Sequence, residues 1–200
     1  MPVRQWIWVA LAGLLGFSAA ALCVIYTMSL PVHRVAATTQ IGGPFTLVDD
    51  TGAPVTEKTV AGKPYVMYFG YTFCPDVCPT TLQTLGAAEK AMGPSAKDFQ
   101  IVFVTVDPQR DTPAQLKDYL SSAAFAPGVI GLTGTTDEIG RIAKAYGVYY
   151  EKAGDGAGYA VNHSSAIYLM NPQGRFDSVM AYGMTPQETR DAVLKAMHAS

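Results

Sequence analysis

The pattern of hydrophobic residues predicts an α/β domain, and two observations carry that prediction. Two short apolar runs, Pro64–Gly70 and Ile101–Asp107, have no polar alternation, as is typical of strands buried on both faces of a sheet. Between them, apolar residues recur at helical spacing: Leu82, Leu85, Ala88 and Met92. A strand, a helix and a strand in this order imply a right-handed crossover and parallel pairing of the two strands.

Elements with recognisable ends flank this unit. Before it, "GPFTLVDDTGAPVTE" has two short apolar runs around Asp49–Gly52, which predicts a hairpin. The helix between the two buried strands is expected to begin at about Pro79 and to end before Gly93. Near the end of the chain, "AIYLM" and "RFDSVMAY" flank Asn171–Gly174, a turn sequence that predicts an antiparallel hairpin.

Three further helices are expected where a threonine precedes a Glu or Gln by three residues, the pattern of a capping box. These starts are Thr112–Gln115, Thr135–Glu138 and Thr185–Glu188. The second helix should end at Gly147, and the third is terminal. The resulting order is βαβ, further α and short β units, a β-hairpin and a last helix. This is the order of a thioredoxin-like three-layer sandwich, which we predict for residues 43–200.

The N-terminal residues predict a membrane anchor. No charged residue occurs from Gln5 to Pro31, a longer apolar stretch than the roughly 20 residues that span a bilayer. We therefore expect a transmembrane helix over residues 6–30, within an anchor of residues 1–32, and a linker over residues 33–42. Small residues at Val35–Thr38 leave a cleaved signal peptide as the alternative.

Charges near the anchor predict its orientation. The positive residues before it favour a cytoplasmic N-terminus, and no Arg-rich transit peptide precedes it. We expect a single-pass protein of the bacterial cytoplasmic membrane with its C-terminal domain on the periplasmic side. The chain has 14 Lys and Arg against 16 Asp and Glu, a net charge of −2 without blocks of like charge, so nucleic acid is not expected as a partner.

The stretch "GYTFCPDVCPTTL" carries the chemistry, because Cys74 and Cys78 are the only cysteines outside the predicted anchor. Each precedes a proline, which disfavours helical backbone, so we expect both to be extended, with Cys78 in the N-cap region. The positive end of the helix dipole then favours thiolates. Three chemistries stay open for such a pair: a structural disulfide, a redox couple and a soft metal site.

His163 is the histidine best placed to extend this pair. It lies just before the strand expected from about Ser165, in a loop that faces the cysteine loop in thioredoxin-like folds. His33 lies beside the membrane segment, and His198 is third from the end of the chain. Two thiolates and an imidazole suit Cu(I) and can also bind Cu(II), whereas Zn(II) usually takes four ligands.

The chain resembles the Sco/SenC family in three motifs that occur in the family's order. They are "GYTFCPDVCPTTL", "VTVDPQRDTP" and "VNHSSAIYLMNPQGRF". The resemblance covers residues from about 41 to 198. Its members are membrane-anchored thioredoxin-fold proteins that help to mature the copper A centre of cytochrome c oxidase. The resemblance implies that Cys74, Cys78 and His163 bind one copper ion, as Cu(I) or Cu(II). It also implies two partners: the copper-receiving subunit of the oxidase and another copper carrier.

Two carboxylates near these ligands are candidates for a supporting role. Asp76 lies between the cysteines, where it can steer metal or partner, or hydrogen-bond to the backbone of a turn. Asp107 follows the second buried strand at the same edge of the sheet, where it can support the ligands or only build the turn. Aromatic residues of the cysteine segment should pack around the site, and Phe73 suits a docking surface.

Two enzymatic functions compete with copper delivery. A membrane-tethered thiol-disulfide oxidoreductase would use Cys74 and Cys78 to reduce the cysteines of the copper-receiving subunit. A peroxidase of the same fold would need a threonine and an arginine beside the attacking cysteine, for which Thr72 and Arg110 are candidates. The sequence does not decide whether the chain is a catalyst, and one pair of thiolates can serve metal binding and thiol exchange in turn.

Overall fold

The computed structural model describes residues 41–156 and 158–198. The predicted membrane segment, residues 6–30, and most of the predicted linker lie outside these residues. Within the described part, no helix is both long enough and apolar enough to cross a bilayer.

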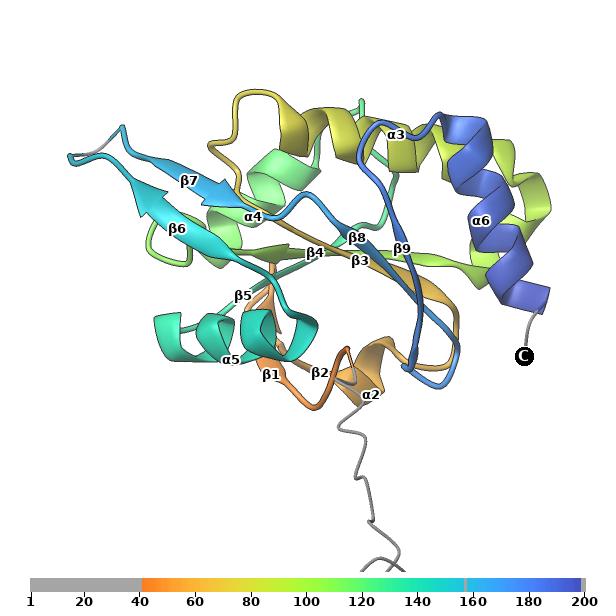
Figure 1. The fold of residues 1–200 in the computed structure, drawn as a ribbon, viewed down its shortest axis with the longest axis horizontal. Coiled ribbons are helices and arrows are strands. Elements are labelled where there is room, and N and C mark those ends of the chain that lie inside the picture. Colours follow the sequence, from red (N-terminus) through yellow and green to blue (C-terminus); the bar gives the residue numbers. More distant parts are fainter. Residues whose placement is uncertain (1–40, 157, 199–200) are drawn as a thin grey trace, which may run out of the picture. The chain divides into compact units, whose positions relative to one another are not determined.

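A seven-stranded mixed sheet forms the centre of the domain, in the order β2-β1-β5-β4-β3-β8-β9 (Figure 1). Its strands are β1 (Thr46–Asp49), β2 (Pro54–Thr56), β3 (Tyr65–Gly70), β4 (Gln100–Thr105), β5 (Ile130–Thr133), β8 (Ile167–Met170) and β9 (Phe176–Met180). The two predicted buried strands, β3 and β4, pair in parallel, as expected from their crossover helix. Both predicted hairpins, β1–β2 and β8–β9, are confirmed as antiparallel pairs.

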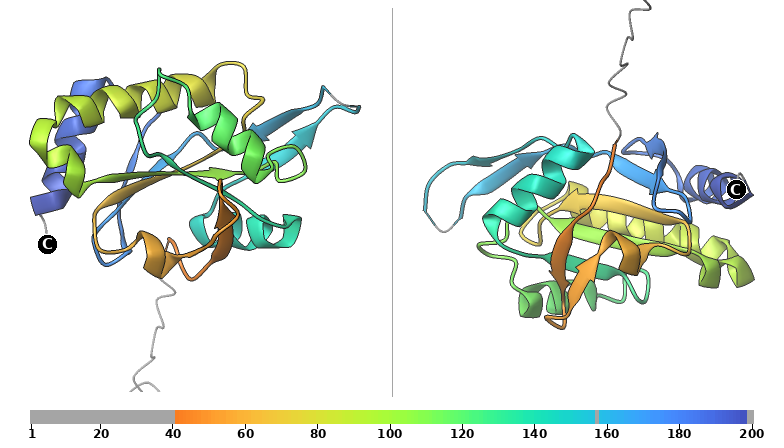
Figure 2. Two further views of the ribbon diagram at one scale, coloured as in Figure 1. Left: turned by 180° about the vertical axis from the view of Figure 1, so that it is seen from behind. Right: turned by 90° about the horizontal axis from the view of Figure 1, so that it is seen from below.

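Helices cover both faces of this sheet, which gives the predicted three layers (Figures 1 and 2). One face carries α3 (Val77–Ala91), α4 (Pro113–Leu120) and α6 (Pro186–His198). The other carries α5 (Thr136–Tyr146) and the short α2 (Glu57–Val60), and a 3-10 helix η1 (Gly93–Asp98) follows α3. Because β3 lies between β4 and β8 and beneath helices, all six of its residues are buried.

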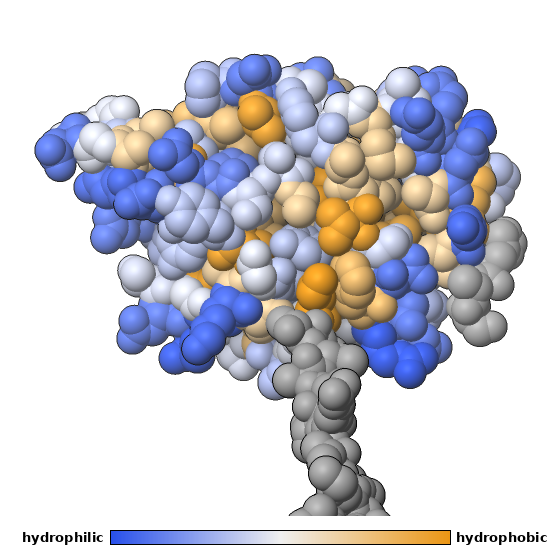
Figure 3. Space-filling model, viewed as in Figure 1, coloured by the Kyte–Doolittle hydropathy of each residue, from blue (hydrophilic) through white to orange (hydrophobic). Residues whose placement is uncertain are grey.

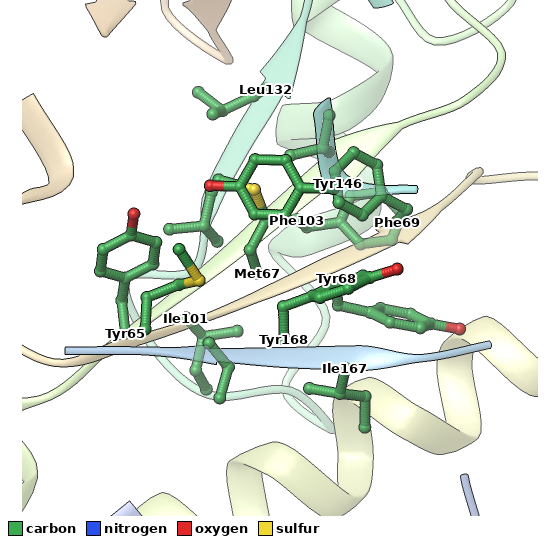
Figure 4. Close-up of a cluster of buried hydrophobic side chains, with 14 of the residues drawn as sticks. Tyr65, Met67, Tyr68, Phe69, Ile101, Phe103, Leu132, Tyr146, Ile167 and Tyr168 are labelled. Atoms are coloured by element: carbon green, nitrogen blue, oxygen red, sulfur yellow. The ribbon is translucent and has the colours of Figure 1, made fainter. Parts of the chain in front are cut away.

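Aromatic side chains fill the core around β3 (Figure 4). The ring of Phe69 lies 5.4 Å from that of Tyr146 and 5.9 Å from that of Tyr168, measured between centroids, the second pair at 87°. On the other face of β3, Tyr68 lies 6.0 Å from Phe103. Tilted and edge-to-face pairs of this kind add roughly 0.5–1.5 kcal/mol each beyond the area they bury. The end of β3 is therefore a rigid base for the loop that follows it.

The predicted helix starts are present, but one capping box is only half formed. Reciprocal hydrogen bonds join Thr135 to Glu138 and Thr185 to Glu188. At α4, Thr112 Oγ1 accepts from the backbone N–H of Gln115, but the Gln115 side chain donates to Thr72 Oγ1 instead of returning to Thr112. Gln115 thus connects α4 to the segment that leads to the cysteines.

A second, two-stranded sheet was not predicted from the sequence. Within residues 41–156 and 158–198, strands β6 (Tyr150–Ala153) and β7 (Ala160–His163) pair only with each other, in register from Tyr150 opposite His163 to Ala153 opposite Ala160. Most of their side chains are exposed or half-buried. Figure 3, in the view of Figure 1, shows hydrophilic side chains at the outer end of this hairpin, whereas hydrophobic residues gather over β8 and β9.

Candidate metal centre

The cysteine loop connects the end of β3 to the start of α3. Cys74 lies in the loop, where its backbone N–H donates to the carbonyl of Tyr71 at 3.2 Å, and it is half-buried. Cys78 is fully buried. The expected extended backbone at Cys78 is wrong, because α3 begins at Val77 and Asp76 is its N-cap, which makes Cys78 the second helical residue. Pro79 is compatible with this start because first-turn N–H groups have no intrahelical partner for it to remove.

His163 reaches the cysteines from the other sheet. It is the last residue of β7, and its Nε2 lies 3.4 Å from the Sγ of Cys78. Its Nδ1 lies 2.9 Å from the carbonyl oxygen of Ser164. Because a carbonyl oxygen only accepts hydrogen bonds, Nδ1 carries the proton and Nε2 presents its lone pair toward the sulfur. The Tyr71 ring, 5.8 Å away at 88°, packs edge-on against the imidazole.

The predicted ligand set is therefore assembled in space. The two Sγ atoms and an imidazole nitrogen all lie within 4.8 Å of one another, the only such group of three His, Cys, Asp or Glu residues in the described part of the chain. Both cysteines are free thiols. A soft metal ion fits these donors because two sulfurs and an imidazole with a free lone pair converge on one point.

The two thiols share charge unequally. A hydrogen bond from Cys78, with further bonds from backbone N–H groups of α3, lowers the pKa of Cys74 to about 5. The same bond to Cys74, together with complete burial, raises the pKa of Cys78. The two shifts have opposite directions, so the half-exposed Cys74 is the more acidic of the two thiols.

The space beneath Cys78 leaves no room for a larger residue at the end of β3. A Cβ atom built on Gly70 would lie 2.8 Å from Cys78 Sγ and 2.8 Å from the Phe103 ring. Such distances are well below van der Waals contact, so glycine is required where the sulfur approaches the strand. Sequence reasoning missed this role, although a glycine closing an apolar strand is a recognised sign of close approach.

Asp111 fixes the cysteine segment through hydrogen bonds to Thr72 and Thr105. This fully buried carboxylate accepts from the backbone N–H of Thr72 at 3.0 Å, from Thr72 Oγ1 at 2.7 Å and from Thr105 Oγ1 at 2.6 Å. Thr72 lies two residues before Cys74, and Asp111 therefore ties that segment to the end of β4. A peroxidase would need Thr72 and Arg110 beside the attacking cysteine. Thr72 instead bonds to Asp111 and Gln115. Arg110 bonds to Asp107 and to the carbonyl of Tyr159.

The two candidate carboxylates have different positions. Asp76 is at the exposed start of α3, where its Oδ1 accepts weakly from Thr80 Oγ1 at 3.4 Å. Asp107 is buried and accepts from Arg110 Nε and from the Tyr159 hydroxyl, which lies at 2.6 Å. Neither belongs to the three-ligand group. Asp107 does more than build a turn, since its side chain reaches the β6–β7 hairpin.

Comparisons with known proteins agree with this site. The SCO1/SenC family model matches residues 33–198. The SenC protein of Rhodobacter capsulatus is 42% identical over 160 residues, which cover 79% of this chain and 71% of that protein. The chain spans about half the length of mitochondrial relatives that it also matches, for example 46% of an Arabidopsis thaliana SCO1 homolog.

Solved structures show the same fold. The copper-bound structure of Bradyrhizobium japonicum ScoI is 43% identical with a TM-score of 0.72, covering 78% of this chain and 99% of that one. A second structure is that of BsSco, described as a member of the Sco family of cytochrome c oxidase assembly proteins in which a disulfide switch was identified. Its sequence is 25% identical, and the TM-score is 0.66. It covers 80% of this chain and 95% of that one.

Proposed function

Because the chain belongs to the SCO1/SenC family, we propose that it is a copper metallochaperone that carries one copper ion on Cys74, Cys78 and His163. The observation that carries the proposal is the convergence of these three donors within 4.8 Å. Copper is the cargo here, and the copper-bound Bradyrhizobium relative supports the choice of metal. Two soft thiolates and an imidazole suit Cu(I), which accepts low coordination numbers, better than Zn(II), which usually requires a fourth ligand.

The site is prepared to take up a cation. Cys74 is the more acidic of the two thiols, so it is the first to offer a thiolate to an incoming cation. His163 needs no rearrangement of its proton, because Ser164 fixes the tautomer that leaves Nε2 free. Half-exposure of Cys74 and His163 leaves the metal open on one side to incoming ligands of a recipient. Copper can then leave by exchange of one ligand at a time.

The recipient that we propose is the copper A subunit of cytochrome c oxidase, with another copper carrier as the source. The description of the BsSco structure as one of the cytochrome c oxidase assembly proteins supports this step. We also propose that residues 6–30 anchor the chain in the bacterial cytoplasmic membrane and place residues 43–200 on its periplasmic side. An anchor of this kind would hold the site close to a membrane-bound recipient.

A second candidate function, reduction of the recipient's disulfide, is favoured by the free dithiol and the low pKa of Cys74. The Cys74 thiolate would attack one sulfur of that disulfide and release the other as a thiolate. Cys78, after losing its proton, would then attack the Cys74 sulfur of this mixed disulfide and release the recipient's second sulfur as a thiolate. A Cys74–Cys78 disulfide forms, and the recipient, reduced by two electrons, takes up protons as a dithiol. His163 forms no bond in this exchange and contributes least among the groups that lower the pKa of Cys74, so it should be nearly dispensable for the reaction.

Anaerobic titration of the reduced chain in detergent with Cu(I), against a competing chelator, separates the two functions. We expect one tightly bound Cu(I) per chain and a loss of affinity of about 10-fold or more in His163→Ala, since even indirect partners of a metal contribute 10–100-fold. His33→Ala, which removes another histidine, should match the wild type. Equal binding by the wild type and His163→Ala would reject the copper assignment and leave the redox function.

A further inference from the structure

Arg110 is enclosed by aromatic rings beside the candidate metal centre. Its side chain is only 15% exposed. The guanidinium carbon lies 3.6 Å from the centroid of the Tyr159 ring and 4.7 Å from that of Phe73. It is therefore sandwiched between the segment before β7 and the residue that precedes Cys74. Planar stacking of this kind is a property of arginine that lysine does not share.

Hydrogen bonds fix the same guanidinium in direction. Nε donates to Asp107 Oδ2 at 2.5 Å, and Nη1 donates to the carbonyl oxygen of Tyr159 at 2.9 Å. The other oxygen of Asp107 accepts from the Tyr159 hydroxyl at 2.6 Å. Asp107 and Arg110 thus hold both the backbone and the side chain of one residue, Tyr159. The carboxylate is 4% exposed, so these charge-assisted bonds are shielded from water.

Tyr159 immediately precedes β7, the strand that ends at His163. That strand has no hydrogen-bonded partner in the seven-stranded sheet, because β6 and β7 form a sheet of their own. The position of His163 relative to Cys74 consequently depends on the short link to β8, which pairs with β3, and on side-chain contacts between the hairpin and the rest of the domain. The Arg110 cluster is such a contact, and it touches the cysteine segment at Phe73 and the hairpin at Tyr159.

We propose that Arg110 is a positioning residue of the metal centre: through Asp107 and Tyr159 it holds the β6–β7 hairpin, and with it His163, against the segment that carries Cys74. This inference rests on the proposed copper function. Arg110 itself touches no ligand atom; it acts by fixing where the imidazole sits. The pairing explains why Asp107, which is not a ligand, is buried at this edge of the sheet.

A double-mutant cycle tests this role in the full reduced chain. We expect Arg110→Lys, which keeps the charge but loses the stacked fork, to lower Cu(I) affinity about 10-fold, as removal of outer partners of a metal ligand does. Combined with His163→Ala, the same substitution should lower affinity no further, because it acts only through the imidazole. Lys152→Ala is the matched control, since Lys152 is a second cation over the Tyr159 ring, at 4.1 Å, but belongs to β6 and so lies within the hairpin itself.

Amide hydrogen exchange of the metal-free protein gives an independent result. Arg110→Lys should speed exchange in Tyr150–Ala153 and Ala160–His163 and leave Tyr65–Gly70 unchanged, since only the hairpin loses its attachment. Equal acceleration in both regions would indicate a general loss of stability, and unchanged exchange in the hairpin would show that Arg110 does not hold it; either result would overturn the positioning role.

The outcomes for the two proposals are distinct. If the wild type binds copper and His163→Ala weakens it, but Arg110→Lys binds as the wild type or loses equal affinity with and without His163, the inference on Arg110 is wrong and the copper function stands. If the wild type does not bind Cu(I), the copper function is wrong, and the inference falls with it.

Discussion

The two halves of the metal centre come from regions of very different packing. The cysteines follow β3, which is hydrogen-bonded on both edges and buried along its whole length. His163 ends β7, which pairs with β6 alone among the described strands and has most of its side chains outside the core. A site built in this way combines a rigid pair of sulfurs with an imidazole on a peripheral arm.

The largest expected contrast between the two regions is in stability. Phe103→Ala should lower the free energy of unfolding by about 3–5 kcal/mol, because it empties fully buried space beneath the cysteine loop. Val161→Ala in β7 should cost about 1–2 kcal/mol, from two methylene equivalents at a nearly buried position. Urea unfolding of both variants measures this. Similar losses for the two would show that the hairpin is as much a part of the core as β4.

A smaller effect should arise where the rigid half approaches its sulfur. Gly70→Ala should destabilise the fold by about 1–3 kcal/mol through overpacking against Cys78 and Phe103, and should also weaken Cu(I) binding. The control is Gly140→Ala in α5, where the new methyl group would have only an ordinary contact at 3.7 Å. That substitution should stabilise by about 0.5–1 kcal/mol through helix propensity. Unchanged copper affinity in Gly70→Ala would mean that the sulfur relocates freely.

The smallest effect concerns the pH dependence of stability that arises from Asp111, the carboxyl group bonded to the cysteine segment. Burial raises the pKa of Asp111 above 3.8, although bonds from Thr105 and Thr72 act against this. The folded state therefore binds this proton more tightly than the unfolded state does. Stability of the wild type relative to Asp111→Asn should rise as the pH falls through the folded pKa toward 3.8, as measured by unfolding at several pH values. A relative loss on acidification would show instead that the folded protein stabilises the anion.

Strong local signals made most of the fold predictable. Continuous apolar runs gave β3 and β4, and threonine caps followed by Glu gave the starts of α5 and α6. The β6–β7 hairpin escaped prediction because its strands are four residues long and lie mostly outside the core, so neither length nor alternation marks them. Its stability comes from contacts across the chain, such as Tyr159 with Arg110, that no local pattern encodes.

The ligands were predictable as residue types, but their supports were not. Cys74, Cys78 and His163 stood out because few soft donors exist in the chain, and the structure brings them together. The backbone at Cys78 was mispredicted because the preference of residues before proline is weaker than the gain from starting α3 at Val77. The partners of Asp111 lie on β4 and on the cysteine segment, 6 and 39 residues away, beyond the reach of spacing arguments.

The turn over residues 107–111 constrains its own length. Backbone N–H groups of Arg110 and Asp111 both donate to the carbonyl of Asp107, while their side chains leave toward the hairpin and toward Thr72. An exposed tip such as Gln109 ordinarily tolerates inserted residues. Here one added residue would rotate both neighbours out of place and detach the imidazole and the thiols together. We therefore expect this turn to accept substitutions at Gln109 but no inserted residue beside it.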